Sequence, residues 1–212
     1  MKNRIKITLF LVAVTIMTGC ASKYTKLNPE TMNYLSKSSE NNIVLEYKYN
    51  TLEKKYLKKE LKYGVKTVSV KITNNSEKDI VLGTDFKFTY ENGNEVSLLE
   101  VDYVFKTLKQ SPASYLWYLP LSFLQLYSGT KTTQNGSYVT TEPKSVFPIG
   151  LIIGPGLTLG NMIAAGDANK NFKNDLTEFD IINKPIKKGE TIYGIIGLRT
   201  NQYDSIKIKK IN

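Results

Sequence analysis

The chain has 212 residues, a formal net charge of +10, no histidine and one cysteine, Cys20. The absence of histidine excludes Ser-His-Asp and Cys-His catalysis and any His-ligated zinc or copper site. A single cysteine excludes an internal disulfide. We therefore expect a protein that is not an enzyme and that holds no metal or cofactor.

Lysine supplies nearly all of the positive charge, because Arg4 and Arg199 are the only arginines. Lysine lacks the planar fork with which arginine binds phosphates and carboxylates in a bidentate manner, so we expect no nucleic-acid partner. A lysine-rich surface can contact anionic lipid headgroups or glycans. The simpler interpretation is a solvated surface.

Residues 1–19 have the layout of a secretory signal peptide. Lys2, Arg4 and Lys6 form a basic start, residues 7–17 carry no charge, and small residues lead to Cys20. The apolar run is too short to span a membrane as a mature helix. We predict that residues 1–19 are cleaved.

The ending Thr18-Gly19-Cys20 resembles the lipobox of bacterial lipoprotein precursors. The resemblance implies cleavage between Gly19 and Cys20, attachment of lipid to the Cys20 thiol, and acylation, for instance by palmitate, of the new amino terminus. Two or more acyl chains anchor a protein stably. In a Gram-negative cell, Ala21 resembles the pattern of outer-membrane lipoproteins. The alternative is an ordinary secreted protein with a cysteine near its cleavage site.

Residues 20–41 are rich in Ser, Lys, Asn and Thr, which predicts a lipidated, flexible tether. We expect one folded domain over residues 42–212. Alternating apolar residues predict its strands, which are residues 43–49, 65–73, 80–82, 86–90, 192–198 and 205–211. Gly194 and Gly197 inside a strand indicate a bulge or a close backbone approach. Residues 53–62 suit either a short amphipathic helix or an exposed loop, and their basic charge also raises a membrane-surface hypothesis.

The strand pattern is typical of an immunoglobulin-like sandwich, and residues 70–76 followed by 79–82 resemble the opening strands of small envelope lipoprotein domains. The expected fold is therefore α+β, an antiparallel immunoglobulin-like β-sandwich interrupted by a long apolar insertion over about residues 96–180. Helical spacing of apolar residues predicts a helix at the start of this insertion, within residues 96–110.

Two uncharged runs, 111–130 and 145–166, flank a polar loop in the insertion. They predict an apolar helical hairpin over about residues 111–166 that either inserts into the bilayer or packs within the protein. In the second run, two pairs of glycines have the spacing that lets helices approach closely in lipid: Gly150, Gly154, Gly156 and Gly160. Against insertion, Pro120, Pro148 and Pro155 interrupt the runs.

Residues 167–178 nearly match a calcium-binding EF-hand loop, with Asp175 and Glu178 at two liganding positions. Phe172 stands where that loop needs glycine, and apolar residues recur at helical spacing, so we predict a helix here and no metal site. An enzyme using carboxylates such as Asp85, Glu100, Asp102 or Asp175 is a third, weaker alternative.

These observations predict a cell-envelope lipoprotein that is exported, anchored by lipid on Cys20 to a bacterial membrane, and non-enzymatic. Its expected role is a structural or protein-binding module at the membrane surface, with another envelope protein as partner. The alternative is a membrane-active or lipid-handling protein whose glycine-rich hairpin enters the bilayer.

Overall fold

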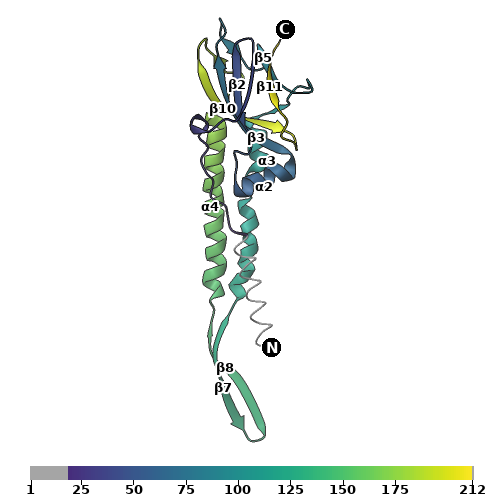
Figure 1. Ribbon diagram of the computed structural model, residues 1–212. Helices are drawn as coiled ribbons and strands as arrows, with labels where there is room; N and C mark the ends of the chain where they lie inside the picture. Colours follow the sequence, from purple (N-terminus) through teal and green to yellow (C-terminus); the bar gives the residue numbers. More distant parts are fainter. Residues whose placement is uncertain (1–18, 212) are drawn as a thin grey trace. The chain divides into compact units, whose positions relative to one another are not determined.

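The computed structural model describes residues 19–211, so the predicted signal peptide lies outside the described residues except for Gly19 (Figure 1). In this range the chain forms three α-helices and eleven β-strands, and the paired strands are antiparallel apart from one isolated bridge. The chain divides into two compact units. Of the described residues, unit 1 contains 19–21 and 111–167, and unit 2 contains 22–110 and 168–211. The expected α+β class is confirmed.

The larger sheet of unit 2 has five strands in the order β1-β2-β3-β10-β6. Their bounds are Ser36–Glu40, Ile43–Lys48, Val65–Asn74, Thr191–Arg199 and Leu98–Leu99, respectively. Strand β3 lies at the centre and is buried over most of its length. It pairs with β2 from Asn74 opposite Ile43, and with β10 from Thr73 opposite Thr191.

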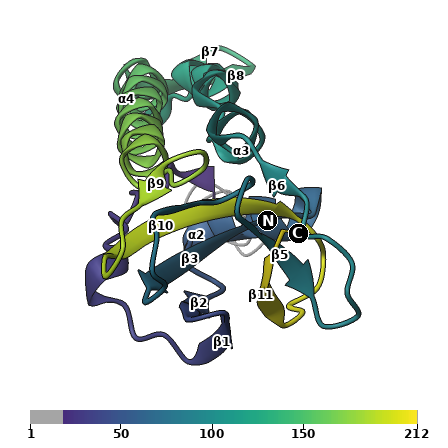
Figure 2. The same cartoon turned by 90° about the horizontal axis from the view of Figure 1, so that it is seen from above.

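Two shorter pairs complete unit 2: β5 (Phe86–Tyr90) with β11 (Ile206–Lys210), and β4 (Ile80–Val81) with β9 (Pro185–Ile186). Figure 2 shows β5 and β11 beside the five-stranded sheet. Alternate residues of β2, β5 and β11 point into a common apolar core, for example Leu45, Phe88 and Ile208. The period-2 patterns that predicted these strands therefore mark their buried faces.

A second core lies between the sheet and the helices of unit 2. Helix α2 (Lys54–Tyr63), helix α3 (Val101–Leu108) and the part of α4 (Gly150–Glu178) from Ala168 onward contribute to it. Tyr56, Leu108 and Phe172 are almost completely buried in this core. Helix α2 ends at Gly64, whose φ of 62° gives the left-handed cap that favours glycine.

The flexible tether predicted over residues 20–41 is wrong for most of its length. A short 3-10 helix, η1 (Pro29–Thr31), and strand β1 lie within it, and Tyr24 and Leu27 are buried in the second core. The segment is mostly polar, and this composition predicted a tether. It also contains the apolar residues Tyr24 and Leu27, and burial of these two side chains holds the segment against the core.

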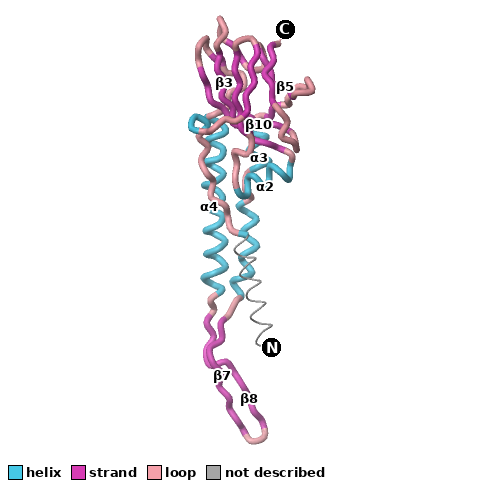
Figure 3. Tube along the Cα trace, viewed as in Figure 1, coloured by secondary structure: helices cyan, strands magenta, loops and turns pink. Residues whose placement is uncertain are grey.

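Unit 1 contains the 3-10 helix η2 (Pro112–Phe123), the strands β7 (Leu126–Asn135) and β8 (Tyr138–Phe147), and the first part of α4 (Figure 3). The predicted apolar helical hairpin over 111–166 is therefore wrong, because a β-hairpin occupies its middle. Threonine-rich strands favour this β-structure. Gly136, with φ of 60°, begins the two-residue turn that joins them.

Gly194 and Gly197 in β10 allow the close approach predicted from the sequence. A Cβ atom at Gly194 would lie 2.5 Å from Ile181 Cγ2, and one at Gly197 would overlap the Val104 side chain. The two glycines thus let the segments beside β10 pack directly onto its backbone.

Candidate membrane-attachment site

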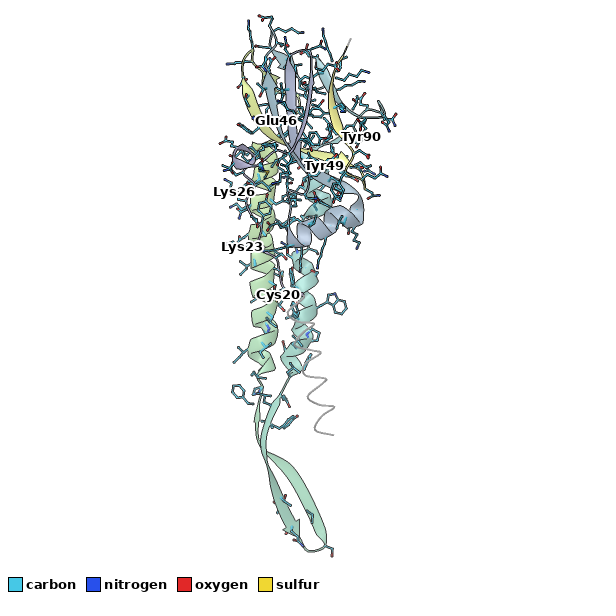
Figure 4. The ribbon with its side chains drawn as sticks, in the orientation of Figure 1. Cys20, Lys23, Lys26, Glu46, Tyr49 and Tyr90 are labelled. Carbon is cyan, nitrogen blue, oxygen red and sulfur yellow. The ribbon has the colours of Figure 1, made fainter. Side chains whose placement is uncertain are left out.

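Cys20 belongs to unit 1 and is half-buried next to η2 and α4 (Figure 4). The backbone N–H of Ala21 donates a hydrogen bond to Asn161 Oδ1 on α4, and Asn161 Nδ2 donates to the carbonyl of Leu157 at 2.7 Å. On the other side, a Cβ atom at Gly19 would overlap the hydroxyl of Tyr118 on η2. The predicted lipid-attachment residue is therefore held at a defined place in unit 1.

Large apolar side chains cover much of the exposed surface of unit 1. Trp117 is 84% exposed and Phe123 is 87% exposed, although both are bulky aromatic residues. The other exposed members of this apolar surface are Leu116, Leu119, Leu124, Leu126, Tyr127, Val139, Val146, Phe147, Leu151, Ile152, Leu159 and Ile163. Large exposed apolar side chains in such number are a feature of surfaces that bind a protein or a membrane.

The four glycines predicted to serve a membrane hairpin divide into two pairs. Gly150 and Gly154 lie against the end of η2, where added Cβ atoms would come within 2.6 Å of Leu124 N and 2.7 Å of Ser122 N. Gly156 and Gly160 would meet no atom within 4 Å. The first pair therefore permits close packing inside unit 1, and the second pair has open space around it on α4, among the exposed aliphatic residues Ile152, Leu159 and Ile163.

Within unit 2, the chain that follows Cys20 is fixed by two sets of hydrogen bonds. Ser22 and Gln110 exchange two of them, from Ser22 N to Oε1 at 3.0 Å and from Nε2 to Ser22 O at 2.7 Å. Farther along, the Tyr24 hydroxyl and the Leu27 N–H both donate to Asp175 Oδ2, at 2.8 and 2.7 Å. We call residues 22–27 the strap.

Asp175 thus has a structural role that its place in the calcium-like pattern did not suggest. Asp175 is 2% exposed. Burial of Tyr24 and the hydrogen bond from its hydroxyl to Asp175 raise the pKa of Tyr24, so the hydroxyl stays protonated and acts as the donor. The predicted helix over 167–178 is confirmed as part of α4. Within residues 19–211, no cluster of three or more acidic or cysteine side chains is arranged to hold a metal ion.

Of the remaining candidate carboxylates, Asp85 and Asp102 have separate structural partners. Asp85 accepts hydrogen bonds from Lys78 Nζ and Val81 N, and the bond from Lys78 is the main cause that lowers its pKa. Asp102 pairs with Lys173 at 3.4 Å, and Glu100 precedes helix α3 at its N-cap position. Asp85 and Asp102 are therefore explained by their ion pairs with lysines.

Over the part of the chain that the structure describes, no helix combines the length and the apolar character needed to cross a bilayer. The two uncharged runs, residues 111–130 and 145–166, are divided between η2, the strands β7 and β8, and α4. No protein-family model, curated protein or solved structure matches this chain.

Proposed function

We propose that this chain is a non-enzymatic lipoprotein of a bacterial cell envelope. In this proposal lipid on Cys20 anchors it, unit 1 contacts the membrane directly, and unit 2 is a structural or protein-binding module at the membrane surface. The observation that carries the proposal is the exposed apolar surface of unit 1 on the same compact unit as Cys20.

Charge supports a membrane rather than water as the environment of this surface. Residues 111–130 and 145–166 contain no charged side chain, whereas the chain as a whole is 23% charged. Each charged group that is moved toward the hydrocarbon core is costly, so the two uncharged runs are compatible with contact with lipid. Tryptophan and tyrosine are also favoured at the membrane–water interface.

The finer architecture of unit 2 belongs to the same proposal. We propose an immunoglobulin-like β-sandwich in which the five-stranded sheet forms one layer and β5 with β11 the other. Side chains from both sheets share one apolar core, which supports this arrangement. Hydrogen bonds from the backbone of β11 to Ser38 and Glu40 of β1 support it further.

A second candidate is an envelope protein partner that covers the same apolar surface. Gly156 and Gly160, which have open space around them beside the exposed Ile152, Leu159 and Ile163, favour it. Small residues between aliphatic side chains allow another helix to approach the α4 backbone closely.

The test compares wild type with Cys20→Ser in a bacterial host, followed by membrane extraction with alkaline carbonate. The variant needs a signal peptide of the ordinary secreted type, so that its cleavage does not depend on the cysteine. Mass spectrometry of the mature amino terminus measures acylation. We expect acylated wild type in the membrane pellet and partial retention of the variant, verified by flotation.

The outcomes separate the candidates. Wild type without acyl chains on Cys20 would contradict the lipoprotein assignment. A variant that becomes fully soluble would contradict direct lipid contact and favour a protein partner for unit 1. A variant that floats with protein-free vesicles after purification would support lipid contact, because no partner is then present.

A further inference from the structure

Helix α2 in unit 2 concentrates positive charge. Five of its ten residues are lysines: Lys54, Lys55, Lys58, Lys59 and Lys62. Three lysine pairs are four residues apart, and such like-charge pairs destabilise a helix. The only acidic residue of α2, Glu60, is fully buried and accepts hydrogen bonds from Thr67 N and Thr67 Oγ1, at 2.6 and 2.7 Å.

The end of α3 extends this charge. Lys59 Nζ donates a hydrogen bond to the carbonyl of Lys109, which is itself exposed. Burial lowers the pKa of Lys59, and the neighbouring charges of Lys62 and Lys109 lower it further. Five lysines of this region take part in none of the ion pairs among the described residues: Lys54, Lys58, Lys59, Lys62 and Lys109. We call α2 together with Lys109 the basic face.

Apolar groups accompany the exposed lysines. Leu61 is 58% exposed and Tyr63 is 49% exposed at the end of α2. The Lys62 ammonium lies 5.3 Å from the centre of the Tyr63 ring, which is a cation–π distance. Lysines interspersed with an exposed leucine and tyrosine are typical of helices that lie at a lipid headgroup layer.

The chain itself ties the basic face to Cys20. Ser22 is bonded to Gln110, which directly follows Lys109, and Gln110 Nε2 also reaches the hydroxyl of Tyr56 on α2 at 3.4 Å. Only Ala21 lies between Cys20 and Ser22, and two successive Cα–Cα steps span at most about 7 Å. The acyl chains of Cys20 would therefore enter the membrane a short distance from these contacts.

We propose that the basic face binds anionic phospholipid headgroups of the leaflet that holds the acyl chains of Cys20. This inference rests on the proposed lipid anchor for its location. Lysines near an anionic surface each strengthen attachment, and the attraction falls off within a Debye length, so only lysines close to the bilayer contribute. The short link from Cys20 to Ser22, which is bonded to Gln110 beside Lys109, satisfies that condition for the basic face.

The test uses the purified mature-length chain with Cys20→Ser, so that lipid on Cys20 does not contribute. Binding is measured by cosedimentation with vesicles of phosphatidylcholine alone and of phosphatidylcholine containing phosphatidylglycerol. The test variant combines Lys54→Gln, Lys58→Gln, Lys62→Gln and Lys109→Gln. The matched control combines Lys37→Gln, Lys187→Gln, Lys209→Gln and Lys210→Gln, which are exposed lysines of other elements in unit 2.

We expect the unsubstituted chain to bind vesicles with phosphatidylglycerol more tightly than vesicles of phosphatidylcholine alone. In the test variant this ratio of affinities should be smaller by at least about tenfold. The control should keep most of it, and 0.5 M NaCl should abolish it by screening. Equal losses in test and control variants, or equal binding to both vesicles, would overturn the proposal. Circular dichroism verifies folding, and the salt dependence of the unsubstituted chain tests the proposal without any variant.

The two proposals can fail separately. Absence of acyl chains on wild-type Cys20 would contradict the anchor but would leave the vesicle comparison unchanged. Loss of phosphatidylglycerol dependence with intact acylation would contradict the basic face alone.

Discussion

At the scale of single residues, Asp175 connects the strap to α4. Its Oδ2 atom accepts two hydrogen bonds in a buried site, from the Tyr24 hydroxyl and the Leu27 N–H. Asp175→Ala leaves both donors buried without an acceptor. We expect the free energy of unfolding to fall by about 3 kcal/mol, measured by urea denaturation. The matched control, Asp102→Ala, removes an exposed ion pair and should change it by less than about 0.5 kcal/mol.

Glu60 provides a prediction of pH dependence. Burial raises the pKa of this carboxyl, and Oε2 has no hydrogen-bond partner among the described residues. A raised pKa in the folded state means that Glu60 contributes stability at pH values below its unfolded pKa. That contribution is lost as the pH rises through the folded pKa.

Glu60→Gln removes the titration and can keep an oxygen for Thr67. Relative to wild type, the variant should gain on the order of 1 kcal/mol in unfolding free energy between pH 4 and pH 8. Urea denaturation across this range measures the difference. A constant difference would show that the carboxyl is already ionised throughout, with Lys66 as the nearby positive charge that lowers its pKa.

Sequence patterns predicted single residues unevenly. The resemblance of residues 18–20 to a lipobox identified Cys20 as a candidate attachment residue, because such a signal is local and continuous. Asp175 was noticed only for a calcium-like spacing, and its actual contacts are with residues about 150 positions away. No local pattern encodes such contacts, although Tyr24 and Leu27 in a polar segment were a usable signal.

At the scale of elements, glycine-to-alanine substitutions in α4 are predicted to lower the stability of unit 1 at one position and to raise it at another. Gly154→Ala places a Cβ atom against the backbone of Ser122 and should destabilise unit 1 by about 1–3 kcal/mol. Gly160→Ala adds a methyl group in open space and should stabilise it by about 0.4–1 kcal/mol, through better helix propensity. Unfolding followed by the fluorescence of Trp117, the only tryptophan, reports on unit 1.

If both alanines instead destabilised unit 1 equally, Gly160 would have a packing role that the structure does not explain. If neither did, the close packing of α4 against the end of η2 would be wrong.

Elements with strong alternation could be predicted from the sequence, and β2, β3, β5, β10 and β11 are confirmed with small shifts at their ends. The hairpin of β7 and β8 could not, because its strands lack an alternation of apolar and polar residues, although their threonines favour β-structure. Asn135 pairs with Tyr138, so the turn of this hairpin begins at Gly136. Pro155 interrupts the second uncharged run, which argued against membrane insertion. It lies in the second turn of α4, where the helix continues with the loss of one backbone hydrogen bond.

At the scale of the whole molecule, the chain divides its chemistry between two units. Unit 2 has two apolar cores and exposes most of its lysines, with Lys66 buried, whereas unit 1 exposes many large apolar side chains. The hydrophobic effect alone would not leave so much apolar surface in water. Composition averaged over the chain could not predict this division, because the charged residues of unit 2 mask the uncharged runs of unit 1.

Trp117 makes the division measurable in one experiment. It is 84% exposed in unit 1, so contact of unit 1 with lipid must change its surroundings. With the unlipidated Cys20→Ser chain and phosphatidylcholine vesicles, we expect its emission to shift to shorter wavelength and to be quenched by brominated acyl chains. The control, Trp117→Phe with Leu35→Trp, moves the reporter to a residue of unit 2 that is 83% exposed, and its emission should not be quenched. Equal quenching of both reporters would mean that vesicles bind the chain without distinguishing its units. An unchanged Trp117 would mean that the apolar surface of unit 1 is covered by protein and not by lipid.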